Sequence, residues 1–276
     1  MRLVTVRTPA GTRAARLEED ELVLLDAGDV GSLLGETDWA RRATAEGGSR
    51  TTLDGADLGP VVPRPPKIVC LGMNYKSHIE EMGREAPSHP TLFAKYARSL
   101  IGARDPIVLP EESEQVDWEV ELAIVIGREI RRARGAEARA AIAGFTVLND
   151  ISMRDWQFRT PQFLQGKTWE GSTPVGPALV TLDEVSGGAA PDLVLTCEVD
   201  GEVMQKGRTS DLLLGPEELV AYISTIVTLE PGDVVATGTP AGVGVGRTPP
   251  LFLRPGQVVR TSIEGIGELL NECVAG

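Results

Sequence analysis

The sequence is short of positive charge, lysine and histidine. Among its 276 residues, 27 basic side chains stand against 40 acidic ones, which gives a formal net charge of −13. We therefore expect no nucleic-acid partner and no membrane partner, because anionic surfaces of that kind are bound by basic patches. Only five of the basic residues are lysines, and His78 and His89 are the two histidines. Each lysine or histidine that falls in a motif is therefore a candidate for chemistry.

Cysteine is also sparse, and long apolar runs are absent. Cys70, Cys197 and Cys273 lie far apart without metal-ligand spacing, a pattern typical of reduced structural thiols in a cytoplasmic protein. No apolar run approaches the roughly 20 residues that a membrane span needs. Residues 1–6 enter strand-like alternation at once, so we expect no signal peptide.

The length suffices for one large domain with a small companion. Short alternating segments joined by glycine and acidic turns predict a small β-rich domain over residues 1–62. The proline-rich stretch 60–66 predicts a stiff, extended connection. We place the catalytic domain over residues 63–276.

One acidic strand dominates the second domain. Residues 116–127 are rich in β-branched side chains and end at a glycine, which predicts a strand. Because side chains alternate along a strand, Glu119 and Glu121 project from the same face, roughly 6–7 Å apart. Two such carboxylates repel each other unless a cation or a proton lies between them. The face is either a solvated acidic surface or a cation site.

A second carboxylate-bearing strand follows. Residues 142–150 are strongly apolar and end at Asp150, which is either a cap for a helix starting at Met153 or a third metal ligand. Asp150, Arg154 and Gln157 recur at helical spacing and would line one side of that helix. A guanidinium and an amide in that position suit a substrate carboxylate.

His78 and Glu81 share a face of a predicted helical turn, three residues apart. A carboxylate beside an imidazole makes a general base, although an incidental surface ion pair has the same spacing. The polar segment 84–90 has the character of a mobile lid. Lys95 is either a surface lysine with a buried stem or a pocket cation, and Lys167 supplies a further cation.

Other segments give weaker predictions. Residues 128–141 predict an exposed helix, the pair Asp200–Gly201 a hairpin, and residues 212–229 a helix with an acidic first turn. The glycine-rich loop 237–244 could offer backbone N–H groups and a threonine hydroxyl to an anion. It does not fit G-x-G-x-x-G, so no dinucleotide site is predicted.

In this order, the motifs resemble those of the fumarylacetoacetate hydrolase family over about residues 63–276. The matching motifs are Asn74-Tyr75-x-x-His78-x-x-Glu81, Asp117-x-Glu119-x-Glu121, Asn149-Asp150-x-Ser152-x-Arg154-Asp155-x-Gln157, Gly166-Lys167, Pro174-Val175-Gly176-Pro177, Pro231-Gly232-Asp233 and Thr237-Gly238-Thr239-Pro240-x-Gly242-Val243-Gly244. The resemblance implies a mostly β fold with some α (α+β), a mixed β-sandwich roll behind a small N-terminal domain.

The resemblance also implies a cofactor, a partner and residue roles. Residues matching Glu119, Glu121 and Asp150 would bind one divalent cation, Mg²⁺ or Mn²⁺ with Ca²⁺ as an alternative, and an all-carboxylate site suits such hard cations. Family members are typically homodimers acting on small dicarbonyl or 2-oxo acids. By position, His78 with Glu81 would activate water or shuttle a proton and Lys167 would neutralise enolate charge. The predicted substrate-binding residues are Arg154, Gln157, Thr239, Tyr75 and Met73.

Two departures from the family pattern concern the substrate. Met73 stands where relatives resembling acylpyruvases carry an arginine, which would make the pocket more apolar. Trp169 replaces the phenylalanine of the commoner Lys-x-Phe-Asp pattern.

The leading hypothesis is a metal-dependent hydrolase that cleaves a C–C bond of an acylpyruvate-type 1,3-dioxo acid, such as fumarylpyruvate in aromatic catabolism, through an enolate. The His78–Glu81 pair favours it, because hydrolysis needs a base for water. The second hypothesis is an isomerase, tautomerase or decarboxylase of a 2-oxo acid of the 5-carboxymethyl-2-hydroxymuconate or oxaloacetate type. The third hypothesis is a non-catalytic binding protein in which the cation only holds strands together. Lys167 and the His78–Glu81 pair argue against this hypothesis.

Overall fold

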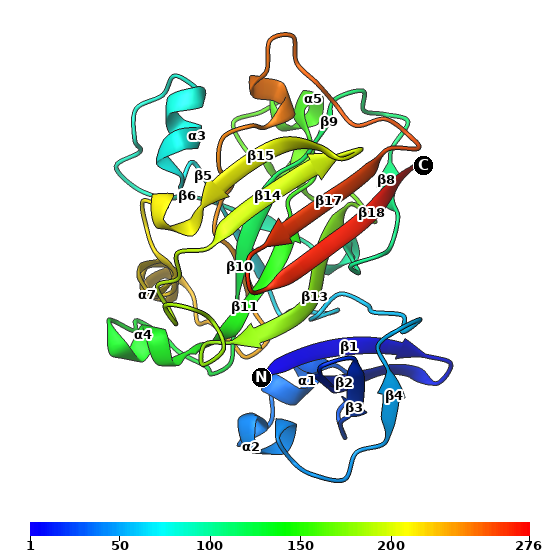
Figure 1. The fold of residues 1–276 in the computed structure, drawn as a ribbon. Helices are drawn as coiled ribbons and strands as arrows, with labels where there is room; N and C mark the ends of the chain where they lie inside the picture. Colours follow the sequence, from blue (N-terminus) through cyan, green and yellow to red (C-terminus); the bar gives the residue numbers. More distant parts are fainter.

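Two β-sheets pack against each other in the computed structural model, which describes residues 1–276 (Figure 1). The larger sheet has eleven strands, in the spatial order β4 (Arg50–Thr52), β3 (Glu21–Leu24), β2 (Gly11–Glu18), β1 (Arg2–Thr8), β13 (Thr173–Thr181), β11 (Ile142–Asn149), β10 (Val120–Ile126), β16 (Val234–Ala236), β5 (Ile68–Gly72) and β6 (Thr91–Lys95), with β7 (Leu100–Ile101) paired to β13.

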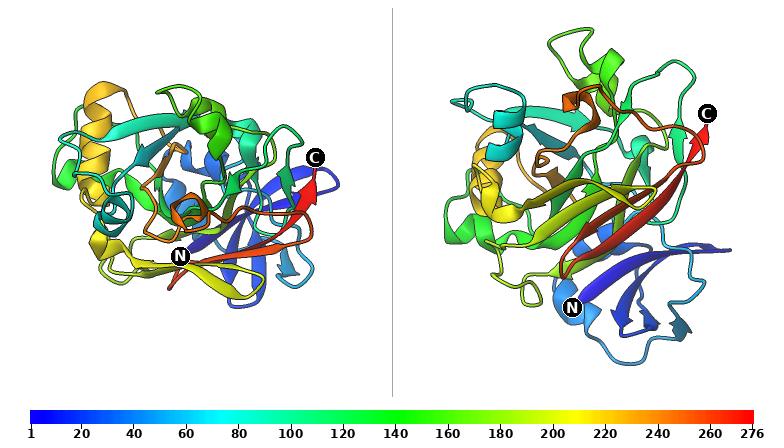
Figure 2. Two further views of the ribbon diagram at one scale, coloured as in Figure 1. Left: turned by 90° about the horizontal axis from the view of Figure 1, so that it is seen from above. Right: turned by 45° about the horizontal axis from the view of Figure 1, so that its top comes forward.

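The smaller sheet has five strands, in the order β15 (Glu202–Arg208), β14 (Val194–Val199), β17 (Val258–Ile263), β18 (Gly267–Ala275) and β8 (Ile107–Leu109). Its yellow-to-red strands lie together on one side of the molecule (Figure 2). A separate ladder joins β9 (Val116–Asp117) to β12 (Ser152–Met153). This strand-rich arrangement confirms the predicted mostly β fold with some α.

The helices are short and lie between strands. They are α1 (Val30–Leu34), α2 (Trp39–Ala43), α3 (Lys76–Glu81), α4 (Ala136–Ala140), α5 (Arg154–Gln157), α6 (Leu164–Lys167) and α7 (Pro216–Ile226), with 3₁₀ turns η1 (Ala97–Ser99), η2 (Thr209–Asp211) and η3 (Gly244–Gly246). The longest, α7, begins with Glu217 and Glu218 in its first turn, where acids suit the helix dipole. No helix combines the length and the apolar character needed to span a membrane.

Strands β10 and β11 form the centre of the protein. All seven residues of β10 and all eight of β11 are buried, because the larger sheet is covered on both faces. Leu122 and Ile124 pack in a core shared with the smaller sheet, whereas Ala123 and Val125 pack in a second core behind it. A strand with both faces covered is mostly apolar, so a charged side chain on it must find partners inside the protein.

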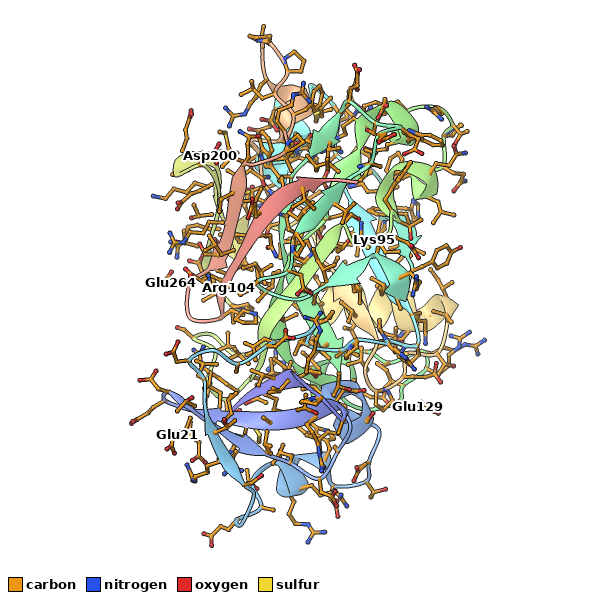
Figure 3. All side chains as sticks on the ribbon, turned by 90° about the vertical axis from the view of Figure 1, so that its right-hand side faces the viewer. Glu21, Lys95, Arg104, Glu129, Asp200 and Glu264 are labelled. Carbon is orange, nitrogen blue, oxygen red and sulfur yellow. The ribbon has the colours of Figure 1, made fainter.

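The N-terminal strands extend the larger sheet. Arg2 and Leu3 of β1 pair with β13, and Leu3 contributes to the same core cluster as Val125. The blue strands form the lower end of the molecule, where Glu21 is labelled (Figure 3). The proline-rich connection contributes Val61 and Val62 to the core. The division into units 1–62 and 63–276 stays a prediction.

Two predicted elements differ from the structure. The helix predicted over residues 128–141 is wrong over most of its length, since only Ala136–Ala140 is helical. Ile130 instead bridges to Leu229, and Gly135 has a φ of 49°, which interrupts a right-handed helix. The strand predicted over residues 116–127 is divided between β9 and β10. The Asp200–Gly201 hairpin is confirmed between β14 and β15, and all three cysteines are buried and unpaired.

Close packing of β11 on β13 gives a first test. A Cβ atom added at Gly144 would lie 2.1 Å from the carbonyl oxygen of Val180, a backbone atom held in the sheet. We expect Gly144→Ala to lower the free energy of unfolding by about 1–3 kcal/mol in urea titration. The exposed Gly28→Ala is the control, because its Cβ would meet only Ser32 Oγ at 3.9 Å. Equal stability of the two variants would contradict the packing described.

Candidate active site

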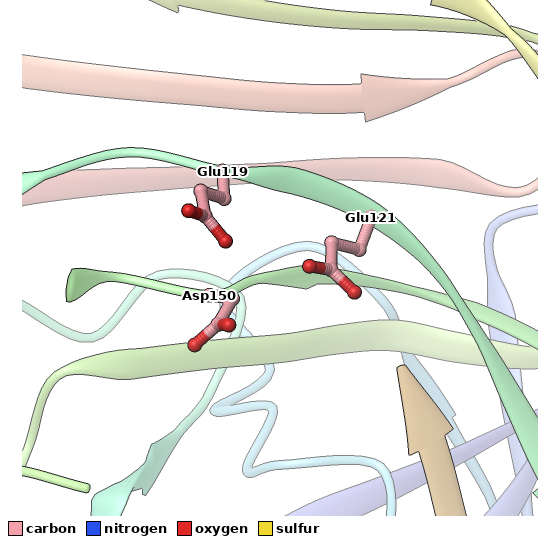
Figure 4. A group of neighbouring side chains, drawn as sticks. All are labelled: Glu119, Glu121 and Asp150. Carbon is pink, nitrogen blue, oxygen red and sulfur yellow. The ribbon is translucent and has the colours of Figure 1, made fainter. Parts of the chain in front are cut away.

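Three carboxylates converge at one end of the central strand pair. Glu119 precedes β10, Glu121 lies on it, and Asp150 follows the antiparallel neighbour β11, so all three reach the same place (Figure 4). One oxygen from each lies within 4.8 Å of the others. All three residues are buried, which excludes the solvated acidic face considered above.

Side chains replace the ladder hydrogen bonds where the acidic strand divides. The backbone N–H of Glu119 donates to Asn149 Oδ1 at 3.0 Å, and that of Val120 donates to Gln205 Oε1 at 2.9 Å. The chain can therefore leave β12 and join β11 without losing backbone hydrogen bonds. This break sets Glu119 at the start of β10, facing the neighbouring carboxylates.

Two buried lysines hold the carboxylates. Lys167 Nζ lies 2.7 Å from Glu119 Oε2 and 2.8 Å from Asp150 Oδ2. Lys95 Nζ lies 2.6 Å from Asp150 Oδ1 and also donates to the carbonyl of Lys167. Lys95, labelled in Figure 3, is therefore an internal cation and not a surface lysine. Both oxygens of Asp150 bind lysines, so Asp150 does not cap α5.

Arg154 extends this network in the other direction. Its Nε donates to Asp117 Oδ2 at 2.8 Å, and its Nη1 donates to Gln157 Oε1 at 2.8 Å. Its Nη2 lies 2.6 Å from Glu119 Oε1, an ion pair whose N–H is not well aligned for a hydrogen bond. Arg154 and Gln157 thus lie together as predicted, on a helix that begins after Asp150.

Six buried charges alternate in sign along this path and balance one another. In order they are Asp117, Arg154, Glu119, Lys167, Asp150 and Lys95. Glu121 is the seventh charge and has no cation. Its Oε2 accepts from the N–H of Gly238 at 2.8 Å, whereas its buried Oε1 has no hydrogen-bond partner.

The pKa values follow from this arrangement. Burial, together with repulsion by Asp150 and Glu119, raises the pKa of Glu121 well above the usual carboxyl range. Burial would also raise the pKa of Glu119, but Lys167 and Arg154 lower it to about 2. Lys167 stays an ammonium, because Asp150 and Glu119 outweigh its burial and raise its pKa. The free Glu121 Oε1 and the neighbouring carboxylates fit a divalent cation, which would replace the proton on Glu121.

The glycine-rich loop after β16 binds carboxylates, but they belong to the protein itself. The N–H donors and their acceptors are Gly238 with Glu121, Gly242 with Glu81, and Gly244 and Val245 with Asp117. The hydroxyl of Thr239 is also engaged, since it donates to the carbonyl of Val120 and accepts from Gln205. The loop therefore fixes the acidic cluster in place.

The histidine pair forms on α3. His78 Nδ1 lies 3.2 Å from Glu81 Oε2, and Glu81 Oε1 accepts from the N–H of Gly242 at 2.8 Å. Glu81 is thus held from both sides and orients the imidazole. His78 Nε2 has no partner within the protein.

A cavity of about 640 Å³ opens beside these groups. The predicted site residues that line it are Met73, His78, Glu119, Arg154, Gln157, Lys167 and Thr239. The other predicted site residues do not line it: Tyr75, Glu121 and Asp150 are buried, and Glu81 is an exposed residue that contacts His78. Tyr75 is fully buried, and burial raises its pKa. Sequence reasoning left the place of Lys95 open and missed the pairing of Asp117 with Arg154, because both depend on contacts between distant elements.

Comparisons with known proteins agree with these motifs. The family described as fumarylacetoacetate (FAA) hydrolase C-terminal matches residues 67–274. A human mitochondrial oxaloacetate tautomerase is 48% identical over 219 residues, 79% of this chain and 69% of the human protein. The solved 5-carboxymethyl-2-hydroxymuconate delta-isomerase from Mycobacterium smegmatis is 32% identical with a TM-score of 0.83, and the maleylpyruvate hydrolase from Sphingobium sp. SYK-6 is 29% identical with a TM-score of 0.82. Each of these two structures matches over the full length of both chains.

The prediction of a cytoplasmic location is wrong by this comparison. The human, bovine and rat relatives are all named as mitochondrial proteins. Reduced, buried thiols, on which that prediction rested, do not distinguish the two compartments.

The carboxyl group of Glu121, which has no cation partner, predicts how stability depends on pH. Because its pKa is raised in the folded chain, folding takes up a proton, so its contribution to stability is full below the ordinary carboxyl pKa of 4.5. That contribution is lost as the pH rises through the raised value. We expect the free energy of unfolding of EDTA-treated protein to fall over this range relative to Glu121→Gln, and Mn²⁺ to reverse the fall. Parallel pH profiles of the two proteins in urea titration would contradict this assignment.

Proposed function

The chain belongs to the fumarylacetoacetate hydrolase family, and we propose that it catalyses keto–enol tautomerisation of a 2-oxo dicarboxylate of the oxaloacetate type. The observation that carries the proposal is the 48% identity to the human oxaloacetate tautomerase. The cavity supports it, because a lysine and an imidazole lie beside a carboxylate cluster. Tautomerisation moves one proton between carbon 3 and the 2-oxo oxygen and breaks no bond of the carbon skeleton.

We propose that Glu119, Glu121 and Asp150 hold one Mg²⁺ or Mn²⁺. The support is the hard, all-oxygen donor set and the unpartnered Glu121 Oε1. When bound there, the cation supplies Lewis-acid polarisation of the substrate's 2-oxo group. A homodimer, which the family resemblance implies, stays a prediction.

Lys167 would act as a cation and not as a base. Its ammonium is held by Glu119 and Asp150, which raise its pKa, and it reaches the cavity wall. Placed there, it would donate a hydrogen bond to the enolate oxygen and compensate the negative charge that develops on it. Arg154 and Gln157, which already hold each other, would orient the adjoining carboxylate.

His78 would move the proton at carbon 3. Glu81 fixes the ring through Nδ1, which leaves Nε2 to take the proton from carbon 3 and return it to the 2-oxo oxygen, or to carry it in the opposite direction. Histidine suits this work because imidazole exchanges protons near neutral pH.

Hydrolysis of an acylpyruvate-type substrate, the leading prediction from the sequence, is the second candidate. The His78–Glu81 pair favours it, because the same base could activate water. The likeness to a maleylpyruvate hydrolase, at 29% identity, supports it less strongly than the 48% identity supports a tautomerase. Decarboxylation of a 2-oxo acid would use the same groups.

Product analysis tests the proposal. We expect the protein with Mg²⁺ or Mn²⁺ to speed the enol–keto conversion of oxaloacetate with no change in mass, and EDTA to remove the effect. Pyruvate and a second acid from acetylpyruvate or fumarylpyruvate would favour hydrolysis, and CO₂ from oxaloacetate would favour decarboxylation. Metal binding without turnover of any substrate would overturn all three activities and favour a non-catalytic protein.

The two histidines form a matched pair for a second test. We expect His78→Ala to lower turnover by about 10²–10⁴-fold through loss of general acid–base catalysis. Affinity for Mn²⁺, measured by calorimetry, should stay unchanged, because His78 does not bind the cation. His89→Ala is the control, since His89 is exposed and its ring hydrogen-bonds only to Ser88. Wild-type turnover by His78→Ala would exclude the proposed role.

A further inference from the structure

Two arginines line the cavity without a carboxylate partner. Arg84 and Arg159 are both exposed and form no ion pair within the protein, whereas Arg154 is engaged by Asp117 and Glu119. In a chain with a net charge of −13, two cations without a protein anion at one cavity call for an explanation.

Arg159 is held on an aromatic platform. Its Cζ lies 3.4 Å from the ring centroid of Trp156, so the guanidinium stacks on the indole. Trp156 is fixed in turn, because its Nε1 donates to the carbonyl of Glu112 and its ring packs edge-on against Trp169, with 5.0 Å between the centroids. Trp169, one of the two departures from the family pattern, thus does not line the cavity but supports the residue that carries Arg159.

Arg84 contacts the other departure. Its Nη1 lies 3.8 Å from Met73 Sδ at the cavity wall. Met73 has a φ of 55°, a left-handed conformation that non-glycine residues rarely adopt. Both departures from the family pattern therefore support an arginine that forms no ion pair within the protein. Met73 contacts Arg84 directly, and Trp169 acts on Arg159 through Trp156.

We infer that Arg84 and Arg159 form a subsite for the distal carboxylate of the substrate. The inference rests on the proposed function, which places the 2-oxo acid end of the substrate at the carboxylate cluster. Arg154 and Lys167 also line the cavity, but Asp117, Glu119 and Asp150 already pair with them, so a distal carboxylate needs cations that no protein anion engages. A guanidinium offers paired N–H donors that match a carboxylate. The substrate class is thus a 2-oxo dicarboxylate, and these two arginines determine its selection.

Binding of a matched pair of acids tests this subsite. Oxaloacetate and 2-oxobutanoate have the same 2-oxo acid end and chain length, but a methyl group replaces the distal carboxylate in the second. We expect the wild-type protein with Mg²⁺ to bind oxaloacetate at least tenfold more tightly in calorimetry. Arg84→Gln with Arg159→Gln should abolish this preference and leave 2-oxobutanoate binding within about twofold, which shows that the variant is folded.

Further variants separate the subsite from general charge effects. Arg134→Gln removes an exposed arginine outside the cavity and should keep the full preference. Trp169→Phe should lower the preference without weakening 2-oxobutanoate binding, because Trp169 acts only by positioning Arg159. A preference that persists in the double variant, or none in the wild type, would overturn the inference. Because the assay measures binding, absence of tautomerase turnover would refute the proposed function without deciding this test.

Discussion

Burial of charge is the constraint on which this structure depends. Taking a charged group out of water costs several kcal/mol unless partners surround it. Asp117, Glu119 and Asp150 meet this condition through two lysines and an arginine, and the alternation leaves only Glu121 without a cation. A proton or a divalent cation must therefore compensate the charge of Glu121.

The topology supplies each member of the network from a different element. The carboxylates come from the ends of β9, β10 and β11, while the cations come from β6, α5 and α6. The glycine-rich loop after β16 then fixes Glu121 and Asp117 through backbone N–H groups. Three members of this frame, Glu119, Arg154 and Lys167, line the cavity. His78 and the arginines at 84 and 159 also line the cavity, but they lie outside this network.

Local spacing explains what the sequence could predict. The alternation of residues 116–127 placed Glu119 and Glu121 on one face, and the spacing of three placed His78 beside Glu81. Contacts between distant segments explain what it could not. Lys95 pairs with Asp150, which lies 55 residues further along the chain. Gln205 donates a hydrogen bond to the Thr239 hydroxyl, which the sequence had suggested for binding an anion. The break before β10 depends on side chains of Asn149 and Gln205, which no pattern within the strand reveals.

We propose that the carboxylate cluster around Glu121 binds one divalent cation. Crystals soaked in Mn²⁺ and measured at the manganese absorption edge test it directly, because anomalous scattering locates the metal independently of activity. We expect one manganese per chain, bound by Glu119, Glu121 and Asp150, and none in Glu121→Gln crystals treated in the same way. Manganese found elsewhere, or a wild-type cluster without manganese at saturating concentration, would contradict it.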